Sequence, residues 1–511
     1  MKRAEAGEEL TIGFLGGSIT QGSLATTMEK VLAMLVSMVM VLAFCVTGVA
    51  ADVELTQHTF AAYQIFKGDL TEGNKLSNVT WGDGVQGEEL LAELNTQAAF
   101  ATCASAADVA KVLETYNTDS TKANAFAKTV AAYVTETKTE GTGTVNLPAA
   151  GYYLIVDTTA TTGEYDAKNL SLLKVNGAGT VTPTKKTDKP TLEKKVKDIN
   201  DSTGTESGWQ DSADYDIKDE IPYKLTATMG DLSNYDHYYL NFHDTMTHLT
   251  LVEGSVEVKV GEKTLAKDQY TVAWDAAKKT MDVAIMDVKA HGATTGTKVT
   301  VTYKATLDAD AVLGSTGNPN TADLEYSNNP NNTGDGTTKP EETGKTPEDK
   351  NIVFTYKVTA NKVKENQQPL EGAEFELFKK VGKESWISKG KLTGTGDNQN
   401  VFEWKGLDDG DYKIVETKTP SGYNTIDPIE FTITAEHEID SADPKLTSLS
   451  GGDVFKGNVT TGAVSANIVN KSGSTLPETG GIGTTVFYVI GGMLMAAAAV
   501  LLITKKRMNN K

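Results

Sequence analysis

Apolar side chains recur at every second position through the middle of this 511-residue chain. The alternation is clearest over residues 223–229, 256–260 and 299–303. In a β-strand, successive side chains point to opposite faces, so each of these runs would bury one face and expose the other. Glycine, asparagine and aspartate separate the runs as turn residues. The pattern predicts a β-sandwich over residues 184–330.

The segments on either side differ in residue composition and in hydrophobic periodicity. Residues 52–183 mix helical and strand patterns, and Ser105 with Asp108 forms a capping box that predicts a helix start there. Residues 331–350 are polar and lack apolar periodicity, which predicts a linker. Residues 351–475 are again rich in strand formers. The sequence therefore predicts a mainly β protein with an α+β domain first and two β-sandwiches after it.

An apolar segment lies near each end of the chain. Residues 31–44 are apolar and lead to small residues around Ala50 and Ala51, which predicts a signal peptide over residues 28–51. Residues 486–503 are long enough to cross a bilayer as a helix, and the basic residues 505–507 would hold its end in the cytoplasm. We therefore expect a secreted protein with a membrane-spanning C-terminal segment.

Charge and cysteine content restrict the function further. The net charge of −20 argues against nucleic acid binding. The two cysteines are Cys45, in the predicted signal peptide, and Cys103, so no disulfide could form within the mature chain. The six histidines do not cluster, and residues 408–411 have too few ligands for a calcium loop. We therefore expect an acidic turn there, no metal, no cofactor, and some staple other than a disulfide.

The stretch Leu476-Pro-Glu-Thr-Gly480, followed by the apolar segment and the basic tail, resembles the sorting signal of Gram-positive surface proteins. The resemblance implies that a sortase cleaves between Thr479 and Gly480 and passes the Thr479 acyl group to an amine. It also implies attachment to the cell wall.

Residues 1–27 resemble the first block of SGNH hydrolases, with Ser18 at the nucleophile position. A nucleophilic serine needs a positioned base, and no matching Asp-x-x-His block follows. We interpret these residues as an extra fragment before a start at Met28, and we do not expect an enzyme.

The third domain resembles the B-type repeat of collagen-binding surface proteins and pilins. The matching stretches are residues 356–362, 370–377 and 412–423, the last being the E-box, and residues 468–470. The resemblance implies an isopeptide bond between Lys362 and Asn470, promoted by Glu416. Burial favours the neutral amine and the protonated acid, and such an acid can donate to the amide oxygen and relay protons.

The middle domain resembles the isopeptide-forming domain of fimbrial subunits through residues 190–196, 242–246 and 320–330. Alternation puts Lys194, rather than Lys195, on the face of Leu192 and Val196, so Lys194 is the expected nucleophile. Asp244 is the expected acid. Asn328 is the expected amide because it alternates with Leu324 and Tyr326, and Asn320 and Asn329 remain alternatives.

The segment between the first two domains, residues 181–190, occupies the position of the pilin motif. In that motif a lysine accepts the sortase-bound threonine of another subunit. Spacing from Pro190 in related sequences favours Lys186, and Lys185 remains open.

These resemblances together indicate the major shaft subunit of a sortase-assembled pilus. The implied partners are a sortase, neighbouring subunits, peptidoglycan and host surface ligands. The alternative is a monomeric wall-anchored adhesin. Only residues 471–475 separate the last strand from Leu476, which is shorter than the stalk that a monomer needs to cross the wall.

Overall fold

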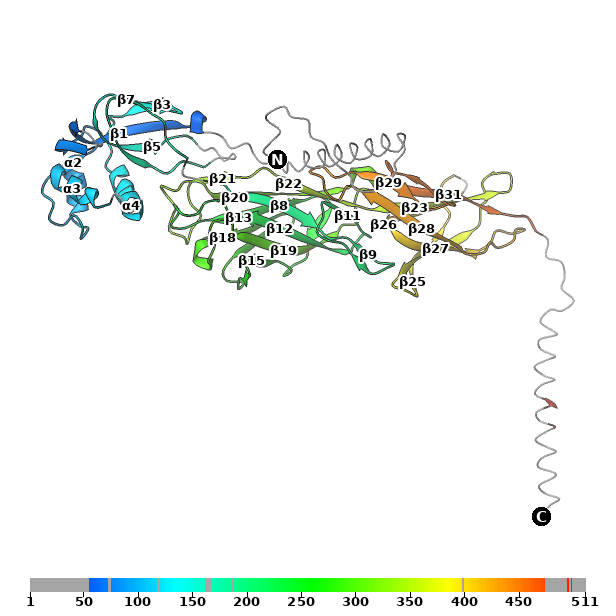
Figure 1. The fold of residues 1–511 in the computed structure, drawn as a ribbon. Coiled ribbons are helices and arrows are strands. Elements are labelled where there is room, and N and C mark those ends of the chain that lie inside the picture. The colour runs from blue at the N-terminus through cyan, green and yellow to red at the C-terminus, as the bar shows by residue number, and fades with distance from the viewer. Residues whose placement is uncertain are drawn as a thin grey trace, which may run out of the picture.

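The computed structural model describes residues 55–71, 75–116, 120–160, 167–185, 188–397 and 399–473, together with residues 494, 495 and 498. Over these ranges the chain forms three units in a row, each with its own hydrophobic core (Figure 1). Strands dominate, which confirms the prediction of a mainly β protein. Within the described part of the chain, none of the helices has the length and apolar character that crossing a bilayer requires. The predicted signal peptide lies outside the described residues.

The first unit combines a five-stranded sheet, in the order β2-β1-β5-β6 with β3 beside β1, with three α-helices and one short 3-10 helix among its described residues. Its strands are β1 (Thr59–Thr71), β2 (Lys75–Trp81), β3 (Thr139–Thr142), β4 (Val145–Leu147), β5 (Gly151–Asp157), β6 (Leu172–Asn176) and β7 (Gly179–Val181). Its helices are η2 (Leu55–Gln57), α2 (Gly87–Leu94), α3 (Ala106–Glu114) and α4 (Ser120–Ala131). The Ser105 hydroxyl oxygen accepts from the Asp108 backbone N–H at 3.3 Å, and the hydroxyl donates to the Asp108 carboxylate at 2.8 Å. The predicted capping box therefore starts α3.

The middle unit is a sandwich of two sheets. Its first strands are β8 (Thr191–Val196), β9 (Ile199–Asn200), β10 (Thr205–Glu206), β11 (Ser212–Asp214), β12 (Glu220–Thr228), β13 (Leu240–Met246), β14 (Leu249–Leu251) and β15 (Glu257–Val260). The rest are β16 (Lys263–Thr264), β17 (Thr271–Asp275), β18 (Thr280–Ile285), β19 (Lys298–Leu307), β20 (Asn318–Ser327), β21 (Thr343–Lys345) and β22 (Asp349–Phe354), with the short helices η3 (Lys289–His291) and η4 (Gly314–Thr316). One sheet runs β11-β22-β20-β13-β18-β17 with β21 beside β20, and the other runs β16-β15-β19-β12-β8 with β14 beside β19.

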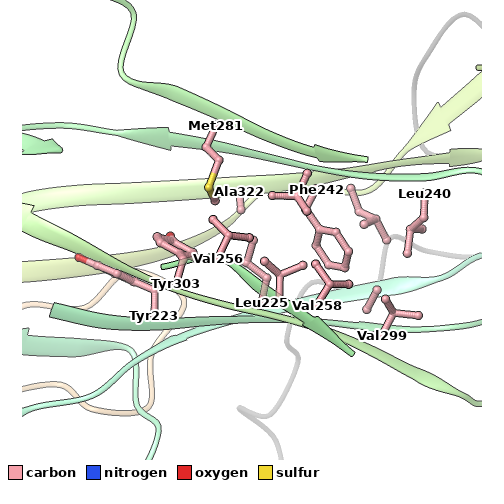
Figure 2. Close-up of a cluster of buried hydrophobic side chains, with 14 of the residues drawn as sticks. Tyr223, Leu225, Leu240, Phe242, Val256, Val258, Met281, Val299, Tyr303 and Ala322 are labelled. Carbon is pink, nitrogen blue, oxygen red and sulfur yellow. The ribbon is translucent and has the colours of Figure 1, made fainter. Parts of the chain in front are cut away.

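The core of the middle unit lies between these two sheets. Figure 2 shows Leu225, Val258 and Val299 from one sheet facing Phe242 and Met281 from the other. All five are fully buried. The runs of alternating apolar residues therefore supply one face of this core, as the sequence predicts.

The boundary between the second and third units differs from the prediction. Strand β22, Asp349–Phe354, pairs with β20 and β11 inside the middle sheet, although the linker was expected to end at residue 350. Its first half is polar, which conceals the strand from hydrophobic periodicity. Only Thr355 separates β22 from the first strand of the third unit. The chain therefore passes from one sandwich to the next within a single residue.

The third unit is a second sandwich. Its strands are β23 (Tyr356–Lys364), β24 (Glu374–Val381), β25 (Ser385–Thr393), β26 (Val401–Leu407), β27 (Gly410–Lys418), β28 (Ile429–His437), β29 (Leu446–Ser450), β30 (Lys456–Asn458) and β31 (Ala463–Asn470). The sheets run β26-β23-β31-β30 and β25-β24-β27-β28-β29. The first strand, β23, and the last, β31, are parallel neighbours. Residues at the ends of these two strands are therefore brought side by side.

Candidate functional site

A lysine is fully buried near the end of the first strand of the third unit. Tyr356, Val358, Ala360 and Lys362 share the inner face of β23, and all four are 0 % exposed. The parallel register sets Lys362 opposite Ile468 on β31. An amine in this position is removed from water while its neighbours on the strand fill the core.

Lys362 meets both partners that the resemblance implies. Its Nζ donates to Oδ1 of Asn470 and to the Ile468 carbonyl, the latter at 3.0 Å. The Asn470 side-chain nitrogen donates to both Glu416 oxygens, Oε1 at 2.9 Å and Oε2 at 3.1 Å. Glu416 Oε1 lies 3.7 Å from Lys362 Nζ. Lysine, amide and acid therefore form one buried cluster.

Burial sets the reactivity of the Lys362 amine. Loss of hydration lowers the pKa of Lys362 to about 8, although the nearby Glu416 carboxylate acts in the opposite direction. At pH 7 roughly a tenth of the amine is then neutral, against roughly one part in a few thousand for an unperturbed lysine. The neutral form has the lone pair that attack on an amide carbon requires.

Glu416 lies at the nitrogen side of the Asn470 amide, whereas the expectation from sequence was a donation to the amide oxygen. Its Oε2 is also held by the Ile426 backbone N–H and the Thr419 hydroxyl, each at 3.2 Å. A carboxyl group fixed between amine and amide nitrogen can take a proton from the first and give one to the second. The geometry suits protonation of departing ammonia.

The middle unit buries a second lysine. Lys194 on β8 lies opposite Leu225 on β12 and is 0 % exposed. Burial lowers the pKa of Lys194, and the Asp244 carboxylate opposes that shift. Lys195 instead bonds the Asp211 carboxylate at 2.7 Å. Strand alternation therefore separates the two lysines in the way the sequence indicates.

A tyrosine hydroxyl links the groups around Lys194. Tyr303, which lies beside Tyr223 in Figure 2, accepts from Lys194 Nζ at 2.9 Å and from the Asn320 side chain at 2.9 Å. It donates to Asp244 Oδ2 at 2.7 Å, and the same oxygen accepts from Lys194 Nζ. Sequence reasoning assigned Tyr303 only to the core, because its position in the alternating run gives no sign of what its hydroxyl contacts.

Asn328 is not brought to this cluster, and the assignment of the amide to Asn328 needs correction. The register of β13 with β20 sets Asp244 opposite Ala322, so residue 328 lies six positions, about 20 Å, farther along the strand. Asn320 lies two positions from Ala322 on the other side, and its side chain is fully buried. Alternation places Asn320 and Asn328 on one face alike, and only the register distinguishes them. The third alternative, Asn329, bonds Glu342 at 2.7 Å.

The turn that contains Asn328 contacts the first unit. The Asn328 carbonyl accepts from the Lys168 backbone N–H at 2.7 Å. The Asn331 side chain accepts from the Ser171 N–H at 2.8 Å and donates to the Asn169 carbonyl at 3.0 Å. These bonds join the first two units beside the segment that carries the pilin-motif lysines.

Lys185 in that segment is exposed. Lys186, Thr479, Gly480 and Ser18 lie outside the described residues.

Comparison with known families matches three parts of the chain. Residues 211–330 match the Gram-positive pilin backbone subunit 2, Cna-B-like domain. Residues 356–445 match the prealbumin-like fold domain SpaA, and residues 468–510 match the LPXTG cell wall anchor motif. The chain therefore carries domains of Gram-positive pilins and an LPXTG anchor, which confirms the resemblance found in the sequence.

Individual relatives are also pilus and surface proteins. The chain is 35% identical over 130 residues to the trypsin-resistant surface T6 protein of Streptococcus pyogenes serotype M6, which covers 24% of this chain and 23% of the relative. The match thus spans about a quarter of that protein's length. The solved T6 backbone pilin of Streptococcus pyogenes is 18% identical, covering 82% of this chain and 97% of that one, with a TM-score of 0.47. The full-length major pilin SpaD of Corynebacterium diphtheriae is 20% identical, covering 82% and 93%, with a TM-score of 0.43.

Proposed function

We propose that this chain, which carries a Gram-positive pilin backbone domain and an LPXTG cell wall anchor, is the structural backbone subunit of a covalently polymerised surface pilus. It is secreted through the signal peptide at residues 28–51 and held by the membrane segment at residues 486–503 until a sortase acts. The observation that carries the proposal is the buried cluster of Lys362, Asn470 and Glu416 in the domain just before the anchor.

The two sandwiches, of the immunoglobulin-like collagen-adhesin type, are each stapled by one isopeptide bond. In the third domain the neutral Lys362 amine attacks the Asn470 side-chain carbonyl carbon, and a new amide bond forms. Glu416 takes the proton that the amine loses and gives one to the departing nitrogen, so ammonia leaves. The support is the contact of Lys362 Nζ with the amide and the position of Glu416 at its nitrogen.

The middle domain carries the second bond. Lys194 is the nucleophile, Asp244 the acid and Asn320 the amide, with Tyr303 as a positioning residue that contacts all three. The chain acts only once on itself and is a substrate of the sortase, so we class it as a structural protein rather than an enzyme.

The choice of Asn320 predicts a mass difference. The mature protein should be lighter than its sequence by two ammonia molecules. Asn320→Ala should restore one of them after allowance for the substitution, because no amide remains for Lys194. Asn328→Ala is the matched control on the same strand face and should keep both losses in intact-mass measurement. If Asn328→Ala restores the mass of one ammonia and Asn320→Ala does not, the isopeptide bond is formed by Asn328.

Polymerisation joins Thr479 of one subunit to a lysine of the next. We assign the acceptor to Lys186 in the segment between β7 and β8. The segment is bounded by Pro183 and Pro190, and each proline restrains its own backbone and that of the residue before it. The neighbouring Lys185 is exposed, which supports accessibility of this segment to a large acyl-enzyme.

The pilus assignment is tested on the cell surface. Blots of cell-wall extracts should show a ladder of bands that survives SDS, because covalently joined subunits do not separate in detergent. A single band at the mass of one wall-attached chain would favour the alternative, a monomeric adhesin bound to peptidoglycan through Thr479.

A further inference from the structure

Carboxylates gather where the second and third domains meet. Seven aspartates from the two sides take part, namely Asp198, Asp201, Asp214, Asp216 and Asp219 of the middle domain and Asp408 and Asp409 of the third. Three cationic side chains pair with them in the described part of the chain, namely Lys379, Lys389 and His437. Carboxylates therefore exceed cations at this contact.

Each cationic side chain at this contact already pairs with one or more of the aspartates. Lys379 Nζ is fully buried and bonds Asp201 at 2.8 Å, Asp216 at 3.0 Å and Asp408 at 3.0 Å. These carboxylates raise the pKa of Lys379, so it stays charged, whereas burial lowers the pKa of the two stapling lysines. His437 Nε2 lies 3.6 Å from Asp214 Oδ1. One oxygen of Asp214 and one of Asp408 therefore face cations, and their other oxygens do not.

Those other oxygens lack charged partners. Asp214 is 2% exposed and Asp408 is 0% exposed. Asp408 Oδ1 is buried with no hydrogen-bond donor among the described residues, and Asp214 is met on this side only by the neutral Tyr356 hydroxyl. Leaving an anionic oxygen buried and unbonded costs several times the worth of an ordinary hydrogen bond. A bound cation would remove this free-energy cost.

Ligand atoms of Asp214, Asp408 and Asp409 all lie within 4.8 Å of one another. A Ca²⁺ ion bonds oxygen at about 2.3–2.6 Å, so oxygens no farther apart than this can share one ion. His437, Lys379 and the Asn200 side chain each engage one oxygen of Asp214, Asp408 and Asp409 respectively, which leaves one oxygen of each carboxylate for an ion. Carboxylate oxygens are the hard donors that Ca²⁺ prefers and that Mg²⁺ accepts.

We propose that Asp214, Asp408 and Asp409 bind one hard divalent cation, Ca²⁺ in the first place, at the contact between the second and third domains. Asp214 ends β11 in the middle domain, and the two others form the turn between β26 and β27 in the third. The ion joins the two sandwiches, independently of the isopeptide bonds inside them. Residues 408–411 alone have too few ligands, and the missing one comes from a distant part of the sequence.

Protons are the competing occupants of these oxygens. Burial raises the pKa of Asp409 to about 7 and raises the pKa of Asp408 and of Asp214. The charge of Asp214 adds to the rise at Asp408, and the charge of Asp198 adds to the rise at Asp214. Without a cation, Asp409 would therefore bind a proton near neutral pH. The experiment must separate the two cases.

The test uses the mature protein, from residue 52 to Thr479, freed of metal with a chelator. Calorimetric titration with CaCl₂ should show one saturable site per molecule, and Ca²⁺ should raise the melting temperature. Asp409→Asn should weaken binding by about tenfold or more, since it removes one of three charged ligands. Asp409 is only half-buried, so the substitution leaves the core intact.

Asp219→Asn is the matched control, because it removes one charge from the same contact outside the proposed site. It should leave Ca²⁺ binding unchanged. The proposal is overturned if the wild-type protein binds neither Ca²⁺ nor Mg²⁺ at millimolar concentration; stabilisation by mild acid would then show that protons occupy these oxygens. It is also overturned if Asp409→Asn leaves Ca²⁺ binding unchanged. Native mass spectrometry of the wild-type protein, with and without Ca²⁺, gives the stoichiometry without any variant.

Discussion

Glu416→Gln protein should be heavier than its parent by one ammonia, after allowance for the substitution, and should lose about 5 kcal/mol of stability in the third domain. Glutamine keeps the shape of the side chain and cannot relay protons, so Lys362 and Asn470 remain unlinked. The two residues are 108 positions apart, and a cross-link that closes a loop of about 100 residues removes that much free energy from the unfolded chain. In a domain of this size the melting temperature should fall by roughly 20 °C.

The matched control is Glu403→Gln on the neighbouring strand β26. Glu403 bonds Lys357 at 2.6 Å near the surface, where an ion pair contributes little. This variant should keep the parent's ammonia losses and melt within a few degrees of it. A parent protein with the full unmodified mass, or a Glu416→Gln protein that still lacks the same ammonia, would contradict the assignment.

Lys186→Ala should abolish the high-mass ladder on the cell surface and leave a folded monomer attached to the wall. The acceptor amine is the only subunit group that the change removes, and Thr479 can still be passed to peptidoglycan. The effect should be all or none, because a sortase has no other lysine in the pilin-motif segment at the favoured spacing. Blots of cell-wall extracts, with circular dichroism of the purified monomer, would measure both parts.

Lys185→Ala is the control one position away and should leave the ladder intact. Loss of the ladder from Lys185→Ala alone would move the acceptor by one residue. A ladder that persists when both lysines are replaced by alanine would show that the acceptor lies elsewhere or that the assignment as a shaft subunit is wrong.

Much of the fold was predictable from the sequence because its signals are local. Alternation at 223–229 and 299–303 gives the inner strand faces, and the Ser105 cap gives the start of α3. The meeting of Lys362 with Asn470 was accessible too, because a conspicuous motif indicated that the first and last strands are neighbours.

Other features depend on contacts that no local pattern encodes. Asn320 and Asn328 have the same phase of alternation, and only the pairing of β13 with β20 brings Asn320 to Tyr303. Strand β22 was missed because its first half is polar. Asp214 meets Asp408 only because two domains pack together.

The position of β22 also decides how the protein can be divided into fragments for study. A middle-domain fragment that stops at residue 330 would lose β21 and β22, and β22 is an interior strand of its sheet, between β20 and β11. The exposed edge of β20 would then be free to pair with other molecules and aggregate. A fragment that begins at residue 351 would carry four of the six residues of that strand as an unpaired N-terminal tail. The second and third domains should therefore be produced as one piece, and a middle-domain fragment should extend through Phe354.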